Sequence, residues 1–164
     1  PFVIGSNEPG KTASDPSGVK NLMDTGVQLG RRFRSLKLWM ILRYFGVEGI
    51  RARIADHMRL ARELAGWVDA DPDFERLAPV PMSVVCFRAR PAGTAMDEAG
   101  LEAFNARLLD AVNATGEAFI SHTKLDGRFT LRMAIGNIRT TDAHVARAWE
   151  LIRAKTSELT THDS

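Results

Sequence analysis

The sequence is poor in the residues that form disulfides and membrane spans. Its 164 residues include one cysteine, Cys86, which excludes an internal disulfide and fits a reducing cytoplasm. The longest apolar run, Leu38–Leu42, is far shorter than the ~18–20 residues that cross a bilayer, so we expect no membrane span. No secretory signal is visible. The chain begins at Pro1 rather than at methionine, which we interpret as a sign of a fragment or a processed product.

Metal and nucleotide signatures are missing as well. The four histidines lack His-x-x-x-His spacing and no Cys/His cluster occurs, so no metal site is predicted. We expect structural roles for His57 and His122. There is also no Gly-x-Gly-x-x-Gly motif, no Walker A loop and no Gly-x-Ser-x-Gly elbow.

Charge of one sign is not in excess, because 22 basic residues nearly balance 20 acidic ones. The basic segment Arg31–Lys37 runs directly into an apolar stretch, whereas nucleic-acid-binding helices carry arginines on an exposed face. We therefore expect no nucleic-acid partner. Two other roles stay open for this segment: a solvated or salt-bridged helix start, or an anion site at the helix N-terminus. Gly30, just before it, either caps the helix or lets the backbone approach a ligand.

The composition is that of one globular unit, with 45% hydrophobic and 26% charged residues. Residues 1–28 are rich in Gly, Ser and Pro and are predicted to form a mobile loop. Residues 29–46 are predicted to form a linking helix that is buried on most sides and ends at Gly46. We expect a small domain at 47–157 and a disordered tail at 158–164.

Periodicity predicts four helices and three strands. The dipeptide Asp126-Gly127 predicts a tight hairpin between the last two strands. The order β-α-β-β-α after two helices predicts an α+β fold, with a small antiparallel sheet and helices on one face. The expected helices are 31–45, 47–69, 97–114 and 142–156, and the expected strands are 81–90, 118–123 and 128–136.

The strand at 128–136 carries the clearest candidate binding residue, Arg132. Its large apolar side chains alternate with small residues that surround this arginine, so one face should be core and the other open. A guanidinium in that setting can bind a carboxylate through two parallel hydrogen bonds. The alternative is a structural ion pair with an acidic residue of a neighbouring element.

Four stretches are informative when they are taken together. They are "LGRRFRSLKLW" (29–39), "RYFGVEGIRARIADHMRLA" (43–61), "DPDFE" with "VCFR" (71–88) and "LRMAIGNIRTTDAHVARAWELI" (131–152). In this order they resemble the C-terminal third of the group II pyridoxal-phosphate-dependent amino-acid decarboxylases, and most closely the aromatic-L-amino-acid branch. The resemblance covers about residues 19–155.

This resemblance implies the small C-terminal domain of an aspartate-aminotransferase-type (fold type I) enzyme, which uses pyridoxal 5'-phosphate at the interface of a homodimer. It implies decarboxylation of an aromatic or similar L-amino acid, or an aldehyde-forming side branch. The family's catalytic lysine follows a histidine, and none of the five lysines here does. We therefore expect the catalytic lysine upstream, and no activity from the 164-residue chain alone. Which residues bind the cofactor is not predicted.

Three features carry over from the family by position. Residues 5–28 correspond to a mobile catalytic loop, although the tyrosine that relatives place early in this loop is not in the chain. Gly30 matches a substrate-pocket position, where glycine is typical of the aromatic branch. Arg132 matches an arginine that binds a substrate carboxylate in the glutamate-decarboxylase branch. The rival interpretation is a standalone ligand-sensing or subunit-interaction module, because similar α+β units also serve regulation.

Overall fold

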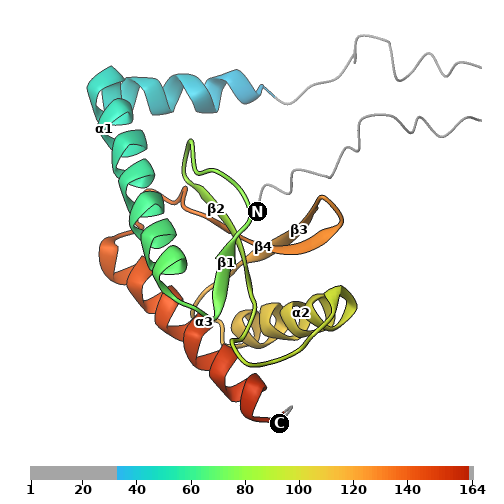
Figure 1. The fold of residues 1–164 in the computed structure, drawn as a ribbon. Helices are drawn as coiled ribbons and strands as arrows, with labels where there is room; N and C mark the ends of the chain where they lie inside the picture. The colour runs from blue at the N-terminus through green and yellow to red at the C-terminus, as the bar shows by residue number, and fades with distance from the viewer. Residues whose placement is uncertain (1–32, 163–164) are drawn as a thin grey trace, which may run out of the picture. The chain divides into compact units, whose positions relative to one another are not determined.

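The structure is a computed structural model that describes residues 33–162 (Figure 1). The chain divides into two units between Arg43 and Tyr44, and each is described by itself. The elements in chain order are α1 (Arg34–Ala70), β1 (Phe74–Arg76), β2 (Val84–Ala89), α2 (Glu98–Ala114), β3 (Ser121–Leu125), β4 (Arg128–Ala134) and α3 (Asp142–His162).

Helix α1 is interrupted at Gly46, where the helix at 31–45 was predicted to end. Gly46 has φ 64° and ψ 176°, a backbone conformation that residues with a Cβ rarely adopt. An added Cβ there would meet no atom within 4 Å, so the requirement for glycine comes from the backbone alone. The expected boundary between two helices is therefore confirmed as a break inside one longer element.

The linking helix is not buried in this structure, which corrects the prediction that most of its sides are covered. Leu36, Trp39 and Met40 are 40%, 57% and 54% exposed, and the Arg43 guanidinium lies over the Trp39 ring at 5.8 Å. Apolar residues occur on every side of the linking helix, so whichever side faces solvent exposes apolar side chains. A contiguous apolar surface of this kind is typical of an interface. None of the helices in residues 33–162 is both long enough and apolar enough to cross a membrane.

Four antiparallel strands form the sheet, in the order β1-β2-β4-β3. Val85 and Phe87 of β2 lie opposite Met133 and Leu131 of β4, so these apolar side chains share one face. Helices α1, α2 and α3 pack their buried residues against it, which confirms the predicted α+β fold with helices on one face. The helical core residues are Leu60, Leu64, Val68, Phe104, Leu108, Val112, Val145, Trp149 and Ile152.

The hairpin between β3 and β4 has the two-residue loop that its sequence predicts. Asp126 and Gly127 both have positive φ, 50° and 77°. Two consecutive residues of positive φ match the right-handed twist of the flanking strands, which is why Asp-Gly favours this turn.

Several elements differ from prediction. Strand β1 lies where no strand was predicted, because it is only three residues long and follows Pro72. Strand β3 begins at Ser121 rather than at 118, since Asn113 holds both the N–H and the C=O of Ile120 against α2, at 2.9 and 3.0 Å. Helix α3 extends to His162, through most of the predicted tail, because Leu159 continues its apolar stripe onto the core.

A buried asparagine joins α2 to the sheet. The Asn105 side chain accepts a hydrogen bond from the Ala89 N–H at 2.8 Å and donates to the Ala89 C=O at 2.8 Å and to the Leu101 C=O at 2.9 Å. Ala89 lies two residues beyond Phe87, the last residue of β2 that pairs with β4. The Asn105 side chain therefore satisfies the backbone groups of Ala89, which a residue of β4 would otherwise pair.

We predict that Asn105→Ala lowers the free energy of unfolding by about 2–4 kcal/mol, because two buried backbone groups of Ala89 lose their partner. Urea denaturation measures the loss. Asn113→Ala is the matched control, since Asn113 holds Ile120 in the same way but is only half-buried. Water can replace the Asn113 amide, so its loss should be about 1 kcal/mol. Equal losses in the two variants would contradict this interpretation.

Candidate functional site

The second face of the sheet carries a row of polar side chains. Arg132 of β4 lies directly opposite Cys86 of β2 on one side and Ser121 of β3 on the other. Paired residues in an antiparallel sheet project to the same face. All three side chains therefore lie opposite the face that carries the core residue Leu131. Arg132 is thus on the face away from the core, as the alternation in the strand predicts.

Arg132 is half-buried and has a neutral partner. Its Nε–H donates to the Ser121 hydroxyl at 3.0 Å. That hydroxyl also lies 3.4 Å from the Arg132 backbone carbonyl, to which it can donate. Within residues 33–162, no carboxylate forms an ion pair with Arg132. The positive charge is therefore not neutralised by any described part of the chain.

Cys86, the other neighbour of Arg132, is a free and half-buried thiol. Burial raises the pKa of this thiol above its usual range, and the positive charge of Arg132 opposes that rise only in part. Cys86 is therefore a protonated thiol at neutral pH. A thiol in that state is a poor nucleophile, so the row is better suited to binding an anion at Arg132 than to covalent chemistry.

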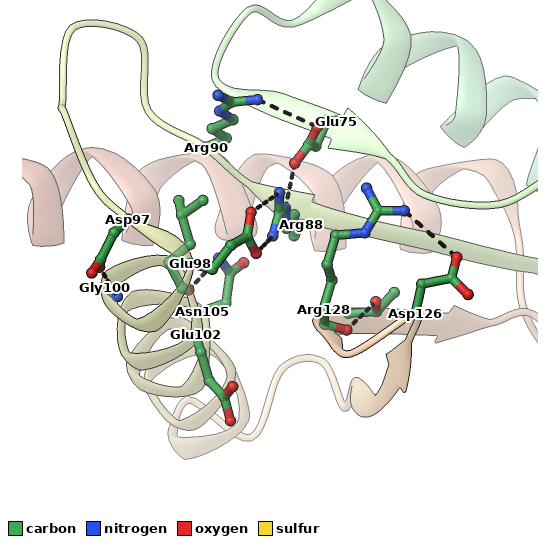
Figure 2. Close-up of polar contacts among 12 residues, drawn as sticks. Glu75, Arg88, Arg90, Asp97, Glu98, Gly100, Glu102, Asn105, Asp126 and Arg128 are labelled. Carbon is green, nitrogen blue, oxygen red and sulfur yellow. Dashed lines mark hydrogen bonds and ion pairs between the residues drawn. The ribbon is translucent and has the colours of Figure 1, made fainter.

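Arg88 lies on the same face of β2 and has entirely different surroundings (Figure 2). Its side chain is 4% exposed and lies between Glu75 of β1 and Glu98, the first residue of α2. Its terminal nitrogens bind the two Glu98 oxygens at 2.7 and 3.1 Å, and its Nε–H donates to Glu75. Arg88 is a structural arginine. The sequence reasoning did not single it out, because its partners come from two separate elements, one of which was not predicted.

These contacts shift the ionisation of the cluster in a consistent direction. The hydrogen bond that Arg88 donates to Glu98 raises the pKa of its guanidinium most, burial opposes this rise, and the hydrogen bond that Arg88 donates to Glu75 adds to it. The hydrogen bond from Arg88 lowers the pKa of Glu98 below its ordinary value of 4.5, although desolvation acts against it. Both charged forms are therefore favoured in the folded state.

The three histidines whose side chains the structure describes have separate surroundings. His57 is buried on α1, and its Nε2 has no hydrogen-bond partner in the described part of the chain. His122 stacks on Phe129 with the ring centres 4.7 Å apart. His144 receives a hydrogen bond from the backbone N–H of Thr141 at the start of α3. Each of these three therefore has surroundings of its own, and no group of ligands with metal-binding geometry occurs in residues 33–162.

Two hollows adjoin the end of α1 and helix α3. The larger, about 570 Å³, is lined by Trp67, Trp149 and other residues, and the smaller, about 310 Å³, lies beside Phe74 and Pro91. The ion pair between Asp71 and Arg153, 2.8 Å long, borders both. Arg132, the described residue that the sequence predicts for the site, lines neither of them.

Gly30 and the loop at 5–28 lie outside the described residues, as do Arg31 and Arg32. Arg34 is the first residue of α1. The predicted pocket position and the predicted anion site at the helix start are therefore not tested by the structure. Of the two predicted substrate-pocket residues, Arg132 alone is described.

The family model of the pyridoxal-dependent decarboxylase conserved domain matches residues 12–90. Over this part the chain is similar to that family, in agreement with the resemblance of its motifs.

Individual relatives agree with this. The chain is 46% identical to tyrosine decarboxylase 2 of Arabidopsis thaliana over 145 residues. This alignment covers 88% of the chain and 26% of the relative. It is 44% identical to phenylacetaldehyde synthase of the same plant, over 90% of the chain and 30% of the relative. The chain thus spans less than a third of the length of the curated relatives it matches.

Solved structures show the same fold. Oryza sativa TDC, solved with PLP and tryptamine, matches 92% of the chain with a TM-score of 0.73 and 38% identity, over 31% of its own length. Catharanthus roseus tryptophan decarboxylase, solved in complex with L-tryptophan, matches 79% of the chain with a TM-score of 0.70 and 40% identity, over 26% of its own length.

The lowered pKa of Glu98 predicts how stability changes in acid. In the unfolded chain this carboxyl takes up protons at a higher pH than in the folded state, so its contribution is complete above about pH 4.5 and is lost as the pH falls through the folded pKa. Glu98→Gln should lose that contribution already at pH 7 and show a flatter decline between pH 5 and pH 3, measured by urea denaturation at each pH.

Glu102→Gln is the control, because Glu102 lies one turn further along α2 and forms an exposed pair with Lys124. This variant should keep the acid dependence of the unsubstituted protein. A decline in Glu98→Gln as steep as in the unsubstituted protein would show that the pair with Arg88 does not contribute.

Proposed function

We propose that this chain is part of a pyridoxal-phosphate-dependent decarboxylase that removes the α-carboxylate of an aromatic or similar L-amino acid. The observation that carries the proposal is the identity of 37–46% to tyrosine, tryptophan and aromatic-L-amino-acid decarboxylases over most of the chain. The rival interpretation, a standalone sensing or interaction module, has no comparable support. When bound, pyridoxal phosphate would accept the electron pair that the departing carboxylate leaves behind.

The described residues do not fit a covalent cofactor site. Of the three lysines in residues 33–162, Lys37 is exposed on α1, Lys124 pairs with Glu102 and Lys155 pairs with Glu158. None of them lines either hollow. We therefore propose that the cofactor lysine belongs to another part of a longer protein. The exposed apolar residues of α1 suit burial against that part or in a homodimer.

A second reaction has specific support. Phenylacetaldehyde synthase is 44% identical to the chain, almost as close as tyrosine decarboxylase 2. An aldehyde-forming reaction on the same class of amino acid is therefore the second candidate. For location we propose the cytoplasm, because Cys86 is a free thiol.

The full-length protein, supplied with pyridoxal phosphate, should release carbon dioxide from tryptophan, tyrosine or dopa. An amine as co-product identifies the decarboxylase. An aldehyde with ammonia and hydrogen peroxide, formed as dioxygen is consumed, identifies the second candidate. The 164-residue chain alone should show no turnover. Release of carbon dioxide by the chain alone would contradict the proposal that the cofactor lysine lies elsewhere.

We further propose that Arg132 binds a carboxylate of the substrate. Arg132→Lys keeps the charge but loses the planar fork, so kcat/KM of the full-length enzyme should fall by roughly ten- to a thousandfold, or ~1.4–4 kcal/mol of transition-state binding. The melting temperature should not change. Arg147→Lys is the control, because Arg147 is exposed on α3 and pairs with Glu117. A lower melting temperature with unchanged kcat/KM in Arg132→Lys would favour the structural role instead.

We propose from the resemblance that Gly30 lines the substrate pocket. Gly30→Val should then reduce kcat/KM for tryptophan more than for a small amino acid, by the ~1–3 kcal/mol that pocket volume supplies. Steady-state kinetics with both substrates measure the difference. Gly66→Val is the control, because a Cβ at Gly66 of α1 meets no atom within 4 Å. Gly46→Val is unsuitable, because Gly46 has a positive φ. Equal losses for large and small substrates would leave Gly30 as a helix cap.

A further inference from the structure

The Ser121 hydroxyl of β3, a neutral group, accepts a hydrogen bond from Arg132 of β4. We propose that Ser121 is a positioning residue: its hydroxyl holds the Nε side of the Arg132 guanidinium, so that the two terminal nitrogens form an end-on fork for a carboxylate. This inference rests on the proposed function, in which Arg132 binds the substrate.

The register places the two residues together. Ser121 and Arg132 are direct partners in the antiparallel pair of β3 and β4. Side chains of such partners project to the same face with their Cβ atoms about 5 Å apart. A short side chain opposite an arginine can therefore reach Nε, the donor nearest to the backbone, but not the terminal nitrogens.

The Ser121 hydroxyl has a defined orientation. A serine hydroxyl has one hydrogen to donate and two lone pairs that accept. Its Oγ lies 3.4 Å from the carbonyl oxygen of Arg132 and 3.0 Å from the Nε of the same residue. Of these two atoms, only the carbonyl oxygen can accept the hydrogen, since Nε of an arginine is always a donor. The hydroxyl thus fixes the arginine from both its backbone and its side chain.

This contact decides which edge of the guanidinium is free. An arginine has five N–H groups and can bind a carboxylate side-on, through Nε and one terminal nitrogen, or end-on, through both terminal nitrogens. Because Ser121 occupies the Nε–H, the side-on edge is taken. The end-on edge keeps four N–H groups, and a carboxylate must approach along the axis of the side chain.

A neutral partner also preserves the charge. Many other arginines of the second unit pair with carboxylates instead, among them Arg59, Arg76, Arg88, Arg147 and Arg153, whereas Arg53 donates to the Ile138 carbonyl. An acidic residue in place of Ser121 would neutralise Arg132 and occupy two of its donors. Serine orients the guanidinium with one hydrogen bond and leaves the full charge for a ligand.

The test uses the full-length enzyme with its cofactor, the variant Arg132→Lys described above and three further variants. Ser121→Ala removes the hydroxyl, Ser121→Thr retains it, and Thr123→Ala removes a hydroxyl two residues along on the same face, opposite Thr130. We expect Ser121→Ala to raise KM about tenfold with kcat changed less than threefold, because the carboxylate loses an oriented fork. Loss of one hydrogen bond corresponds to a change of about tenfold. Ser121→Thr and Thr123→Ala both keep the hydrogen bond to Arg132, so their KM and kcat should stay within about threefold of those of the unsubstituted enzyme.

A binding measurement gives a readout that does not depend on turnover. The probe is 3-phenylpropionate, which has the aromatic ring and the carboxylate of a substrate without its amino group. Calorimetry on the holoenzyme should give a Kd about tenfold higher in Ser121→Ala, restored in Ser121→Thr. A merely structural hydroxyl would instead lower the melting temperature and change neither KM nor this Kd.

The outcomes separate the two proposals. If Arg132→Lys weakens the probe and Ser121→Ala does not, the positioning role is wrong and the role of Arg132 stands. If neither variant affects the probe, the carboxylate site at Arg132 is wrong and Ser121 has nothing to position. If the full-length protein releases neither carbon dioxide nor aldehyde from any amino acid, the proposed function itself is wrong.

Discussion

A buried guanidinium limits how this small sheet can be assembled. The side chain of Arg88 is almost wholly buried, and a buried charge without a partner costs several kcal/mol. Glu75 and Glu98 supply that partner from opposite directions, one from β1 and the other from the first turn of α2. The short strand, the central strand and the helix therefore have to come together in one arrangement, and Asn105 closes the same junction with hydrogen bonds to Ala89.

With the junction fixed in this way, the two faces of the sheet differ in character, because one is apolar and the other carries polar side chains, among them Arg88 and Arg132. The apolar face carries the packing with α1, α2 and α3. On the other face, the two arginines differ in their partners: Arg88 is neutralised by carboxylates, whereas Arg132 meets a hydroxyl and a protonated thiol. An arginine whose charge no described carboxylate neutralises can bind an anionic ligand. That difference supports a ligand-binding role for Arg132 and a structural one for Arg88.

Sequence patterns predicted those structural features that depend only on residues close together in the chain. The break at Gly46, the Asp126-Gly127 turn and the alternation around Arg132 follow from backbone preferences and side-chain period. Contacts between distant segments could not be predicted in this way. Strand β1 is too short to show alternation, so the partners of Arg88 were missed, and Ser121 was placed inside a strand whose true start is set by Asn113. The exposure of Trp39 likewise depends on contacts with distant residues, which no local pattern predicts.

The difference between the two arginines can be measured directly as the stability of matched variants. Arg88→Met and Arg132→Met remove the same charge from the same sheet face, and urea denaturation gives the free energy of unfolding of each. We predict a loss of at least ~1–3 kcal/mol for Arg88→Met, because two carboxylates lose their partner, and a change within about 0.5 kcal/mol for Arg132→Met, which breaks one bond to a neutral hydroxyl. A loss in Arg132→Met as large as that in Arg88→Met would contradict the separation of the two roles.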